Sequence, residues 1–430
     1  MCAHLLQRTS PAQQYYRRLT GIGVEVEFLC PACAVQREQR ADVSLVAACQ
    51  ACLHYLTDEV GDCQGVHGRP GITERPTSFR TDLVETPLPI DRHEVLDIAP
   101  LHDAPGAQWL LLDAAGMLSR LHADEGTWGL AGHIPVLAEP EQPPWNNHVL
   151  TPRLYVSHSG RFAAVVHDYG TRGVVVSLED SRVTLQLHGG DYHHETVPFS
   201  FCFLEHDGRT LVVHRTDWNR LDISDAGSGE LLTARGPTRY RSGEARPAHY
   251  LDYFHGRLVL SPDRTRVVDD GWVWHPVGIP TVWSIEAWLH GNPWEPEGGP
   301  SKRALCARDY YWDHAICWIG PGRIAVGGLG DDEREIVDGV RLFTPEADAP
   351  SGRIWWRSAQ EVGAFPGPRG DFFSDGRRLF SADESGLSVW DLDTGARIGA
   401  IAGFRPTRQH TGACELVEWQ GRMLRRWKYA

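Results

Sequence analysis

The amino-acid sequence predicts an all-β protein in which short strands repeat along most of the chain after a small cysteine-containing domain. Two C-x-x-C pairs lie within residues 30–52, and from about residue 85 short apolar segments recur with turns between them. No segment shows the sustained periodicity of a long helix. Seven units of about fifty residues are typical of a β-propeller and not of a sandwich. We therefore predict a small domain, residues 1–78, followed by a seven-bladed β-propeller, residues 79–430.

The first domain is predicted from its paired cysteines. The stretch GVEVEFLCPAC alternates apolar and acidic residues, as a half-exposed strand does, and runs directly into the first cysteine. Two residues between cysteines allow a tight turn to direct both sulfurs at one ion, and a second pair completes a tetrahedral shell. The spacing C-x2-C-x15-C-x2-C resembles a zinc ribbon, and its metal ligands are then Cys30, Cys33, Cys49 and Cys52.

Other interpretations of these cysteines stay open. A redox pair of the thioredoxin type needs a single C-x-x-C at the start of a helix, iron can occupy the same four-thiolate shell, and the thiols could be unligated. Cys63 and His67 could replace a ligand, although a buried thiol and a surface histidine explain them more simply. We expect structural Zn²⁺, with Fe as the less favoured metal, because metal binding contributes on the order of 10 kcal/mol that a small core lacks.

The propeller prediction depends on a turn that seven segments share. The strand after each turn is mostly apolar, as expected where neighbouring blades cover both faces of a strand. The chain ends nine residues after the last turn, so we expect the C-terminal segment to supply two strands of the last blade. A segment within residues 80–93 should then complete this blade and leave no sheet edge open. The turn residues follow one another at intervals of 45 to 58 residues and are Gly106, Gly160, Gly208, Arg264, Gly322, Gly376 and Gly421.

One unit carries a family resemblance. Residues 373–403, FSDGRRLFSADESGLSVWDLDTGARIGAIAG, resemble a WD-repeat blade, with Ser381 on the second strand and Trp390-Asp391 closing the third. Residues 221–232, LDISDAGSGELL, are a fainter version. The resemblance implies a propeller from about residue 85 onward, and propellers bind partners through loops at the mouth of their central channel.

Acidic and aromatic residues follow the second strand of most units. Carboxylates there would steer a basic partner, and tryptophan and tyrosine would supply contact area, so we expect docking of a protein segment that carries arginine or lysine. Aspartate in a turn also caps backbone N–H groups, which explains any single one of these residues more simply. The predicted partner-binding residues are Asp168, Tyr169, Asp217, Trp218, Asp270, Trp272, Trp312, Asp332 and Asp383.

The charge of the chain limits its partners. The formal net charge is -14, and the first eighty residues hold eight arginines against eight acidic residues. A nucleic acid or an anionic membrane needs a concentrated positive field, so neither is an expected partner. No apolar stretch reaches the roughly eighteen residues of a membrane helix, and we expect a cytoplasmic protein.

Catalytic motifs of the common hydrolase, nucleotide-binding and metalloprotease types are absent from the sequence. We therefore expect a non-catalytic scaffold; the alternative is a hydrolase or lyase with an active site in the channel. That alternative requires His214, His275 and His314 to gather with acidic residues around one pocket. The stretch HGGDYHHET, residues 188–196, is the best further metal or acid–base candidate, although adjacent histidines on a strand face opposite sides.

Overall fold

The structure is a computed structural model of the 430-residue chain. It describes residues 14–20, 25–38, 62–63, 71–88, 94–135, 137–139, 148–274, 276–333, 336–349 and 357–430. This part of the chain is built from strands with a few short helical segments, which confirms the predicted all-β class. Among its helices, none is long and apolar enough to cross a bilayer.

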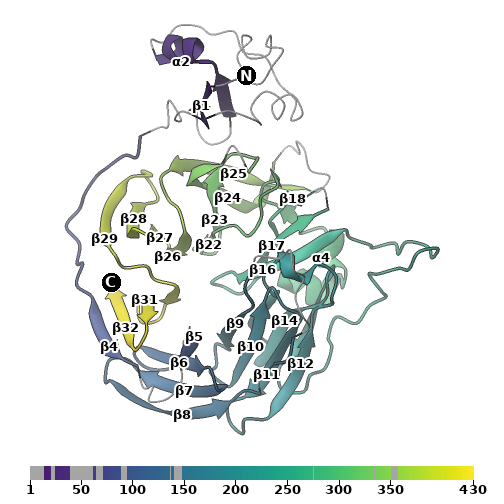
Figure 1. The fold of residues 1–430 in the computed structure, drawn as a ribbon. Helices are drawn as coiled ribbons and strands as arrows, with labels where there is room; N and C mark the ends of the chain where they lie inside the picture. Colours follow the sequence, from purple (N-terminus) through teal and green to yellow (C-terminus); the bar gives the residue numbers. More distant parts are fainter. Residues whose placement is uncertain are drawn as a thin grey trace.

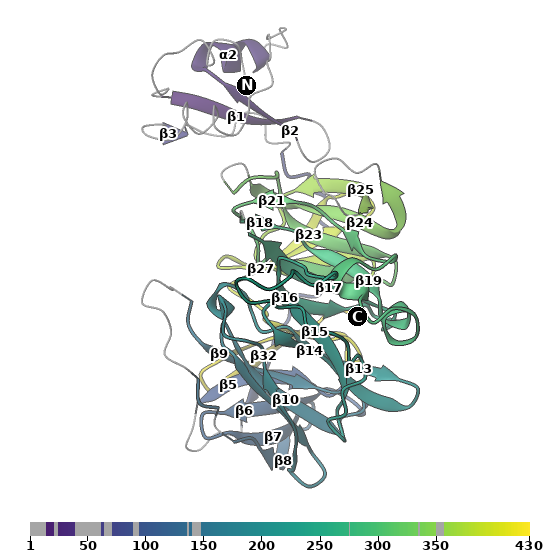
Figure 2. The same ribbon diagram turned by 90° about the vertical axis from the view of Figure 1, so that its right-hand side faces the viewer.

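The N-terminal part forms a small sheet with one helix (Figure 2). The order of its strands is β2-β1-β3, and β3 runs parallel to β1. β2 ends directly before Cys30, as the residue alternation predicts. After Cys30 the chain forms a helix where we expected a tight turn; a proline at the first helical position suits this start because its φ is already helical. The elements are β1 (Gln14–Thr20), β2 (Glu25–Leu29), α2 (Pro31–Glu38) and β3 (Asp62–Cys63).

The rest of the chain forms mainly antiparallel sheets that fan around a common axis, the arrangement of a β-propeller (Figure 1). The first sheet contains β5 (Val95–Pro100), β6 (Gln108–Asp113), β7 (Met117–His122) and β8 (Thr127–His133). The second contains β9 (Thr151–Val156), β10 (Phe162–Asp168), β11 (Arg172–Ser177) and β12 (Val183–His188). The third contains β13 (Phe201–His206), β14 (Arg209–Asp217) and β15 (Arg220–Asp225).

A ten-stranded sheet follows. Its strands are β16 (Tyr253–Leu260), β17 (Arg266–Val273), β18 (Val277–Gly278), β19 (Thr281–Ser284), β20 (Arg303–Ala304), β21 (Arg308–Asp309), β22 (Ile316–Ile319), β23 (Arg323–Leu329), β24 (Val337–Ala349) and β25 (Ser358–Pro366). Two short helical segments, η2 (Ala287–Gly291) and α4 (Glu295–Gly298), connect β19 to β20, and a third, η1 (His194–Thr196), lies between β12 and β13.

Two four-stranded sheets complete the ring. One contains β26 (Asp371–Ser374), β27 (Arg378–Asp383), β28 (Gly386–Asp391) and β29 (Arg397–Ala402). The other contains β30 (Arg408–His410), β31 (Glu415–Gln420), β32 (Met423–Lys428) and β4 (Val84–Pro87). In the unit that resembles a WD repeat, the Trp390 Nε1–H donates a hydrogen bond to Ser381 Oγ at 2.9 Å, which ties its third strand to its second.

In six units the predicted turn residue lies between the first and second strands of a sheet, as expected from the repeat. Arg264 occupies this turn with a φ of +61°, a left-handed conformation that glycine adopts at four equivalent positions. The seventh turn is different. Gly421 joins β31 to β32, which are the second and third strands, so the C-terminal segment supplies three strands and not the two we expected. The additional strand β30 is short and polar, and apolar patterning does not reveal it.

The core lies between neighbouring sheets. One buried cluster joins the sheet β5–β8 to β9–β12 through Leu110 and Val165, and another joins the third sheet to β17 and β19 through Leu211 and Trp283. Trp109 packs with Val417 and Leu424, which brings the last sheet against the first. Each sheet is therefore covered on both faces, and this explains why second strands such as β6 and β10 are almost wholly buried.

An N-terminal strand closes the last sheet. β4 lies inside residues 80–93 and pairs antiparallel with β32, with Leu424 opposite Thr86. The Arg426 guanidinium, which is 1% exposed, donates hydrogen bonds to Glu415 Oε2 at 2.8 Å and to the carbonyl oxygen of Ala123 in the first sheet at 2.8 Å. The first and last sheets are thus joined by a buried charge network as well as by apolar packing.

The segment before β4 also contacts the ring. The Arg75 and Thr77 N–H groups donate to the carbonyl oxygens of Arg397 and Ile398 at 2.9 Å, so this segment runs along the outer strand β29. Phe79 packs directly over Gly399, where an added Cβ would lie 1.6 Å from its ring. Contacts with the ring therefore begin before the predicted domain boundary at residues 78/79.

We predict that Arg426→Met lowers the free energy of unfolding by about 3–5 kcal/mol, because it leaves Glu415 as an unpaired buried charge. Urea unfolding followed by tryptophan fluorescence measures this loss. The double variant Arg426→Met/Glu415→Gln should regain much of it, since neither buried charge then remains. A single variant as stable as the parent would show that the network does not stabilise ring closure.

Candidate binding site at the mouth of the ring

The mouth face is defined here as the end of the ring at which the second strands of the sheets finish. Asp168 is the last residue of β10, Asp217 of β14 and Asp383 of β27. Asp270 lies within β17, and Asp332 follows β23. Because these strands hold equivalent positions in their sheets, the five carboxylates belong to the same end of the ring.

Three of these carboxylates are paired with arginine: Asp217, described with the cavity below, and Asp168 and Asp383. Asp168 is buried and forms an ion pair with Arg153 of the first strand, β9. Asp383 forms an ion pair with Arg369 and accepts a hydrogen bond from the Ser385 N–H at 2.7 Å. Their charge is balanced, so they hold strands and turns in place and do not present bare negative charge.

Asp270 and Tyr169 also make internal contacts. Asp270 is 1% exposed and accepts hydrogen bonds from the backbone N–H of His314 at 2.5 Å and from its Nδ1 at 2.6 Å. The Tyr169 hydroxyl donates to Asp313 Oδ2 at 2.7 Å, which links the sheet β9–β12 to the segment before β22. Asp332 is buried as well. These residues therefore shape the mouth face from within.

The predicted tryptophans form one packed cluster. Trp272 stacks on Phe254 and on Trp312, with ring centroids 4.2 and 4.9 Å apart. The Trp272 Nε1–H donates to Thr196 Oγ1 at 3.2 Å, and the Trp312 Nε1–H donates to the Thr196 carbonyl oxygen at 2.9 Å. Trp218 belongs to the same cluster, and both Trp218 and Trp272 are buried. This cluster anchors the η1 segment to the mouth face.

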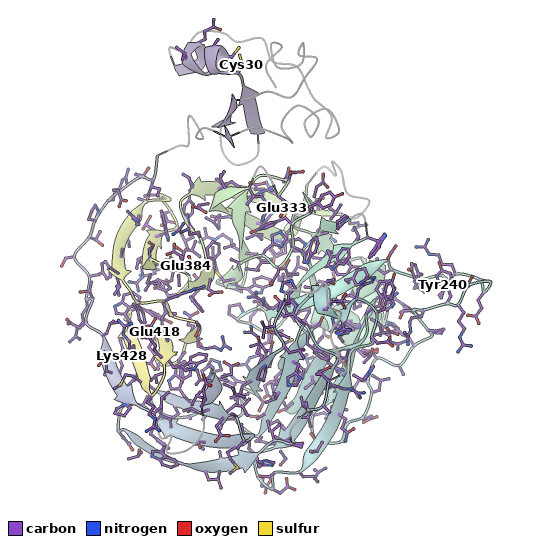
Figure 3. All side chains as sticks on the ribbon, in the orientation of Figure 1. Cys30, Tyr240, Glu333, Glu384, Glu418 and Lys428 are labelled. Carbon is purple, nitrogen blue, oxygen red and sulfur yellow. The ribbon has the colours of Figure 1, made fainter. Side chains whose placement is uncertain are left out.

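A cavity of about 500 Å³ lies beside this cluster. Three of its aromatic side chains are strongly exposed: Tyr192, Tyr240 and Trp274 are 46%, 43% and 45% accessible. We call it the aromatic cavity. It is lined by Asp191, Tyr192, Trp218, Arg239, Tyr240, Tyr250, Asp252 and Trp274. Figure 3 shows Tyr240 on a loop that projects from the ring.

Asp217 holds one wall of the aromatic cavity. Its Oδ2 lies 2.5 Å from the Nε of Arg239, and its Oδ1 accepts the Trp218 N–H at 2.8 Å. Burial raises the pKa of Asp217, although both of these contacts oppose the shift. The loop that carries Tyr192 passes so close that a Cβ on Gly190 would lie 2.7 Å from Asp217 Oδ1, and Gly190 has a φ of +77°. A glycine is therefore required at this position.

Sequence reasoning identified Trp218 and Asp217 but not the exposed aromatic residues of the cavity. Tyr240 and Tyr250 lie in the long connection between β15 and β16, residues 226–252. A loop of this length inside a compact ring is uncommon and is usually functional. The length of the connection could therefore have indicated a binding loop. Trp274 stands two residues after Trp272, so the two share the orientation expected for a strand. Tyr192 lies in the HGGDYHHET stretch, whose histidines are a metal or acid–base candidate and draw attention away from the tyrosine.

The histidines of the enzyme alternative lie in separate networks where the structure describes them. His214 is buried in β14, with its Nε2 3.0 Å from Ser224 Oγ, whereas His314 contacts Asp270. His275 lies outside the described residues. Burial lowers the pKa of His214 to about 4. A buried imidazole with this pKa is neutral at pH 7 and packs within its sheet.

The structure describes half of the predicted metal-ligand set. Cys30 directly precedes α2, and Cys33 lies in its first turn; both are buried, and Figure 3 marks Cys30 at the start of the helix. Cys49 and Cys52 lie outside the described residues, as does His67. Residue Cys63 is in β3, opposite Tyr15 of β1.

No protein-family model matches the chain, and no curated protein matches it at a significant level. Among solved structures, a chain from "Crystal Structure of Mitotic Checkpoint Complex" aligns with a TM-score of 0.47 and 12% sequence identity, over 83% of this chain and 98% of that chain. A similarity of this level supports no statement about function or partner.

We predict that acid destabilises the ring partly through His214. The unfolded imidazole binds its proton near the ordinary pKa of 6.5, whereas the folded one binds it only near 4, so the unfolded state is favoured as pH falls through this window. The expected contribution is about 2 kcal/mol between pH 7 and pH 5. Urea unfolding at both pH values should show a smaller loss for His214→Gln than for the parent. A matched change at exposed His133 should leave the loss unaltered; equal losses in all three proteins would contradict the assignment.

Proposed function

We propose that the protein is a non-catalytic interaction scaffold, a seven-bladed β-propeller whose aromatic cavity binds a basic segment of a protein partner. The blade count treats the ten-stranded sheet as two blades, one around β16, β17 and β19 and one formed by β22–β25. The sparse pairing between them supports this division: β20 pairs with β25 at Ala304 and Ser358 only, and a single further bridge joins Asp309 to Asp332.

The observation that carries the proposal is the composition of the aromatic cavity. Exposed rings of Tyr192, Tyr240 and Trp274 stand beside the carboxylates of Asp191 and Asp252. Aromatic faces attract cations through their negative quadrupole, and carboxylates add charge attraction, so the cavity favours a guanidinium or ammonium group. It does not favour an anion or a plain hydrocarbon.

The exposed arginine that lines the cavity supports the same proposal. Arg239 lines the cavity, and its guanidinium is paired with Asp217 at 2.5 Å and lies 4.0 Å from Asp191. With Asp252, the site has three carboxylates near one arginine. The remaining negative charge and the chain's net charge of -14 both attract a basic ligand.

A protein segment fits this site better than a free small amine. Two of the cavity's aromatic residues, Tyr240 and Tyr250, lie on the long connection that follows β15, and Tyr192 lies on the separate loop before η1. A small amine would contact only part of this surface, and its loss of translational freedom would offset that contact. A peptide can place one basic side chain in the cavity and extend across the neighbouring rings.

We predict that peptides with a central arginine or lysine bind the full chain, whereas matched peptides with glutamine at that position bind at least about tenfold more weakly. Fluorescence anisotropy of labelled peptides measures the binding, which should weaken as salt rises. The double variant Trp274→Ala/Asp252→Asn should lower the affinity about tenfold or more.

Trp128→Ala is the control, because Trp128 is 52% exposed on β8 and lies outside the cavity. It should leave peptide binding unchanged. Equal binding of arginine and glutamine peptides, or equal losses from the cavity variant and Trp128→Ala, would refute the basic-segment proposal.

We also propose that Cys30, Cys33, Cys49 and Cys52 hold a structural zinc ion in the N-terminal domain. The support is their spacing together with the burial of the described pair, since thiols one helical turn apart can face one ion. When bound, zinc would supply folding free energy to a domain with a small core. The reducing cytoplasm, the compartment predicted from the sequence, would keep these thiols available.

We predict about one equivalent of tightly bound zinc that is lost in Cys33→Ser/Cys49→Ser, measured by elemental analysis after dialysis. The peptide affinity of the aromatic cavity should not change in this variant, because the cavity is built from the ring alone. Cys414→Ser, at a thiol in the turn between β30 and β31, is the control and should retain the zinc. Unchanged zinc content in the double variant would exclude these cysteines as its ligands.

A further inference from the structure

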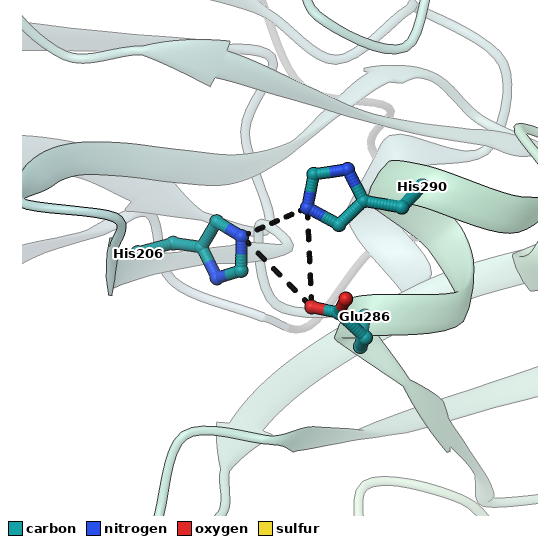
Figure 4. Close-up of side chains that lie close together, drawn as sticks. All are labelled: His206, Glu286 and His290. Atoms are coloured by element: carbon teal, nitrogen blue, oxygen red, sulfur yellow. Dashed lines mark hydrogen bonds and ion pairs between the residues drawn. The ribbon is translucent and has the colours of Figure 1, made fainter.

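The side chains of two histidines and a glutamate converge, as Figure 4 shows. They lie at the end of the third sheet opposite the mouth face. His206 is the last residue of β13, so it lies at the opposite end of the third sheet from Asp217. His290 lies in the π-helical turn η2, which follows β19 in the next sheet, and Glu286 directly precedes that turn. Within the described ranges, this is the one group of three histidine, cysteine or acidic side chains whose ligand atoms all lie within 4.8 Å of one another.

The ligand atoms of this group face a common point. The two Nε2 atoms of His206 and His290 are 3.1 Å apart, and Glu286 Oε2 is 3.9 Å from each of them. Tetrahedral ligands with bonds of about 2.0–2.1 Å lie about 3.4 Å from one another. The three observed separations bracket this value, so small side-chain rotations would place all three atoms around one ion.

A hydrogen bond between the histidines accounts for only part of this geometry. Two neutral imidazoles can share one proton between facing Nε2 atoms, but the carboxylate oxygen then adds no further bond at 3.9 Å. A divalent ion would use the lone pairs of both nitrogens and the charge of Glu286 at once. Asp207 Oδ2, 3.5 Å from His206 Nε2, is within reach as a fourth ligand.

We propose that His206, Glu286 and His290 form a binding site for a divalent first-row transition-metal ion that joins two neighbouring sheets. Two imidazoles and a carboxylate are ligands suited to zinc, nickel or cobalt and not to calcium or magnesium, which prefer oxygen. Glu286 and His290 are 69% and 56% exposed, so an ion can enter from solvent and keep water as a further ligand.

The frame around the site is rigid, which favours binding. Trp288 of η2 is 1% exposed and packs with Leu204 of β13 and Leu211 of β14 in the apolar cluster between the two sheets. Its Nε1–H donates to the Pro293 carbonyl oxygen at 3.2 Å. Single π-helical turns of this kind often occur at functional sites. The backbone that carries the ligands is thus held by packing, and metal binding would order little more than three side chains.

The test uses the full chain after metal removal and compares it with His206→Gln/His290→Gln. Titration with Co²⁺ should show one ion, without a sulfur-to-cobalt charge-transfer band, that the double variant binds at least about tenfold more weakly. Zn²⁺ should raise the melting temperature of the parent at this site and have a smaller effect on the variant. Exposed His249 offers a matched control: His249→Gln should behave as the parent.

The readouts separate this site from the cysteines, because thiolate-bound cobalt has a sulfur charge-transfer band and imidazole-bound cobalt does not. Without metal, the variant and the parent should have similar melting temperatures, since His290 is 56% exposed and glutamine is a polar replacement at the partly buried His206. Cobalt bound through thiolates only, or equal cobalt affinity and stoichiometry in parent and double variant, would overturn the proposal.

Discussion

The structure depends on one constraint: every sheet of the ring is packed on both faces, so the first and last sheets must meet. Trp109 of β6 packs on Val417 of β31, and Arg426 joins Glu415 to the carbonyl of Ala123 across the same boundary. Without this contact, one apolar face of the first sheet and one of the last would be exposed to water. The loss of folding free energy would be proportional to the apolar area exposed. Because β4 pairs with β32, the first and last strands of the ring together form the sheet that closes it.

The same constraint determines how charge is used near the axis. Arg153, Arg257 and Arg408 lie on the first strands of their sheets, and each pairs with an aspartate: Asp168, Asp313 and Asp97. Guanidinium groups suit such positions because their planar fork satisfies a carboxylate and nearby carbonyls together. Three of the five mouth-face carboxylates, Asp168, Asp217 and Asp383, are paired with arginine, and Asp270 is bound to His314. Recognition is therefore left largely to residues carried by longer loops.

The two proposed sites of the ring lie at opposite ends of β14 (Arg209–Asp217). The aromatic cavity is built around the Asp217–Trp218 end, and the His206 cluster is next to the turn before Arg209. Both use side chains from the third sheet and from the sheet that follows it. A partner in the cavity and an ion at the histidine cluster would therefore both contact the boundary between these two sheets, each at a different end of the ring.

The sequence alone determined the β class, the turn of six units and the strand β2 before Cys30, because these follow from local alternation and turn chemistry. It also located residues 80–93 as the segment that contains β4. It did not reveal β30, whose three residues are Arg408, Gln409 and His410, since apolar patterning cannot detect a short polar strand. Nor did it distinguish buried Trp272 from exposed Trp274, or the paired Asp168 from Asp252 in the cavity. Only the tertiary structure decided these, because exposure and charge pairing depend on residues far apart in the chain that ring closure brings together.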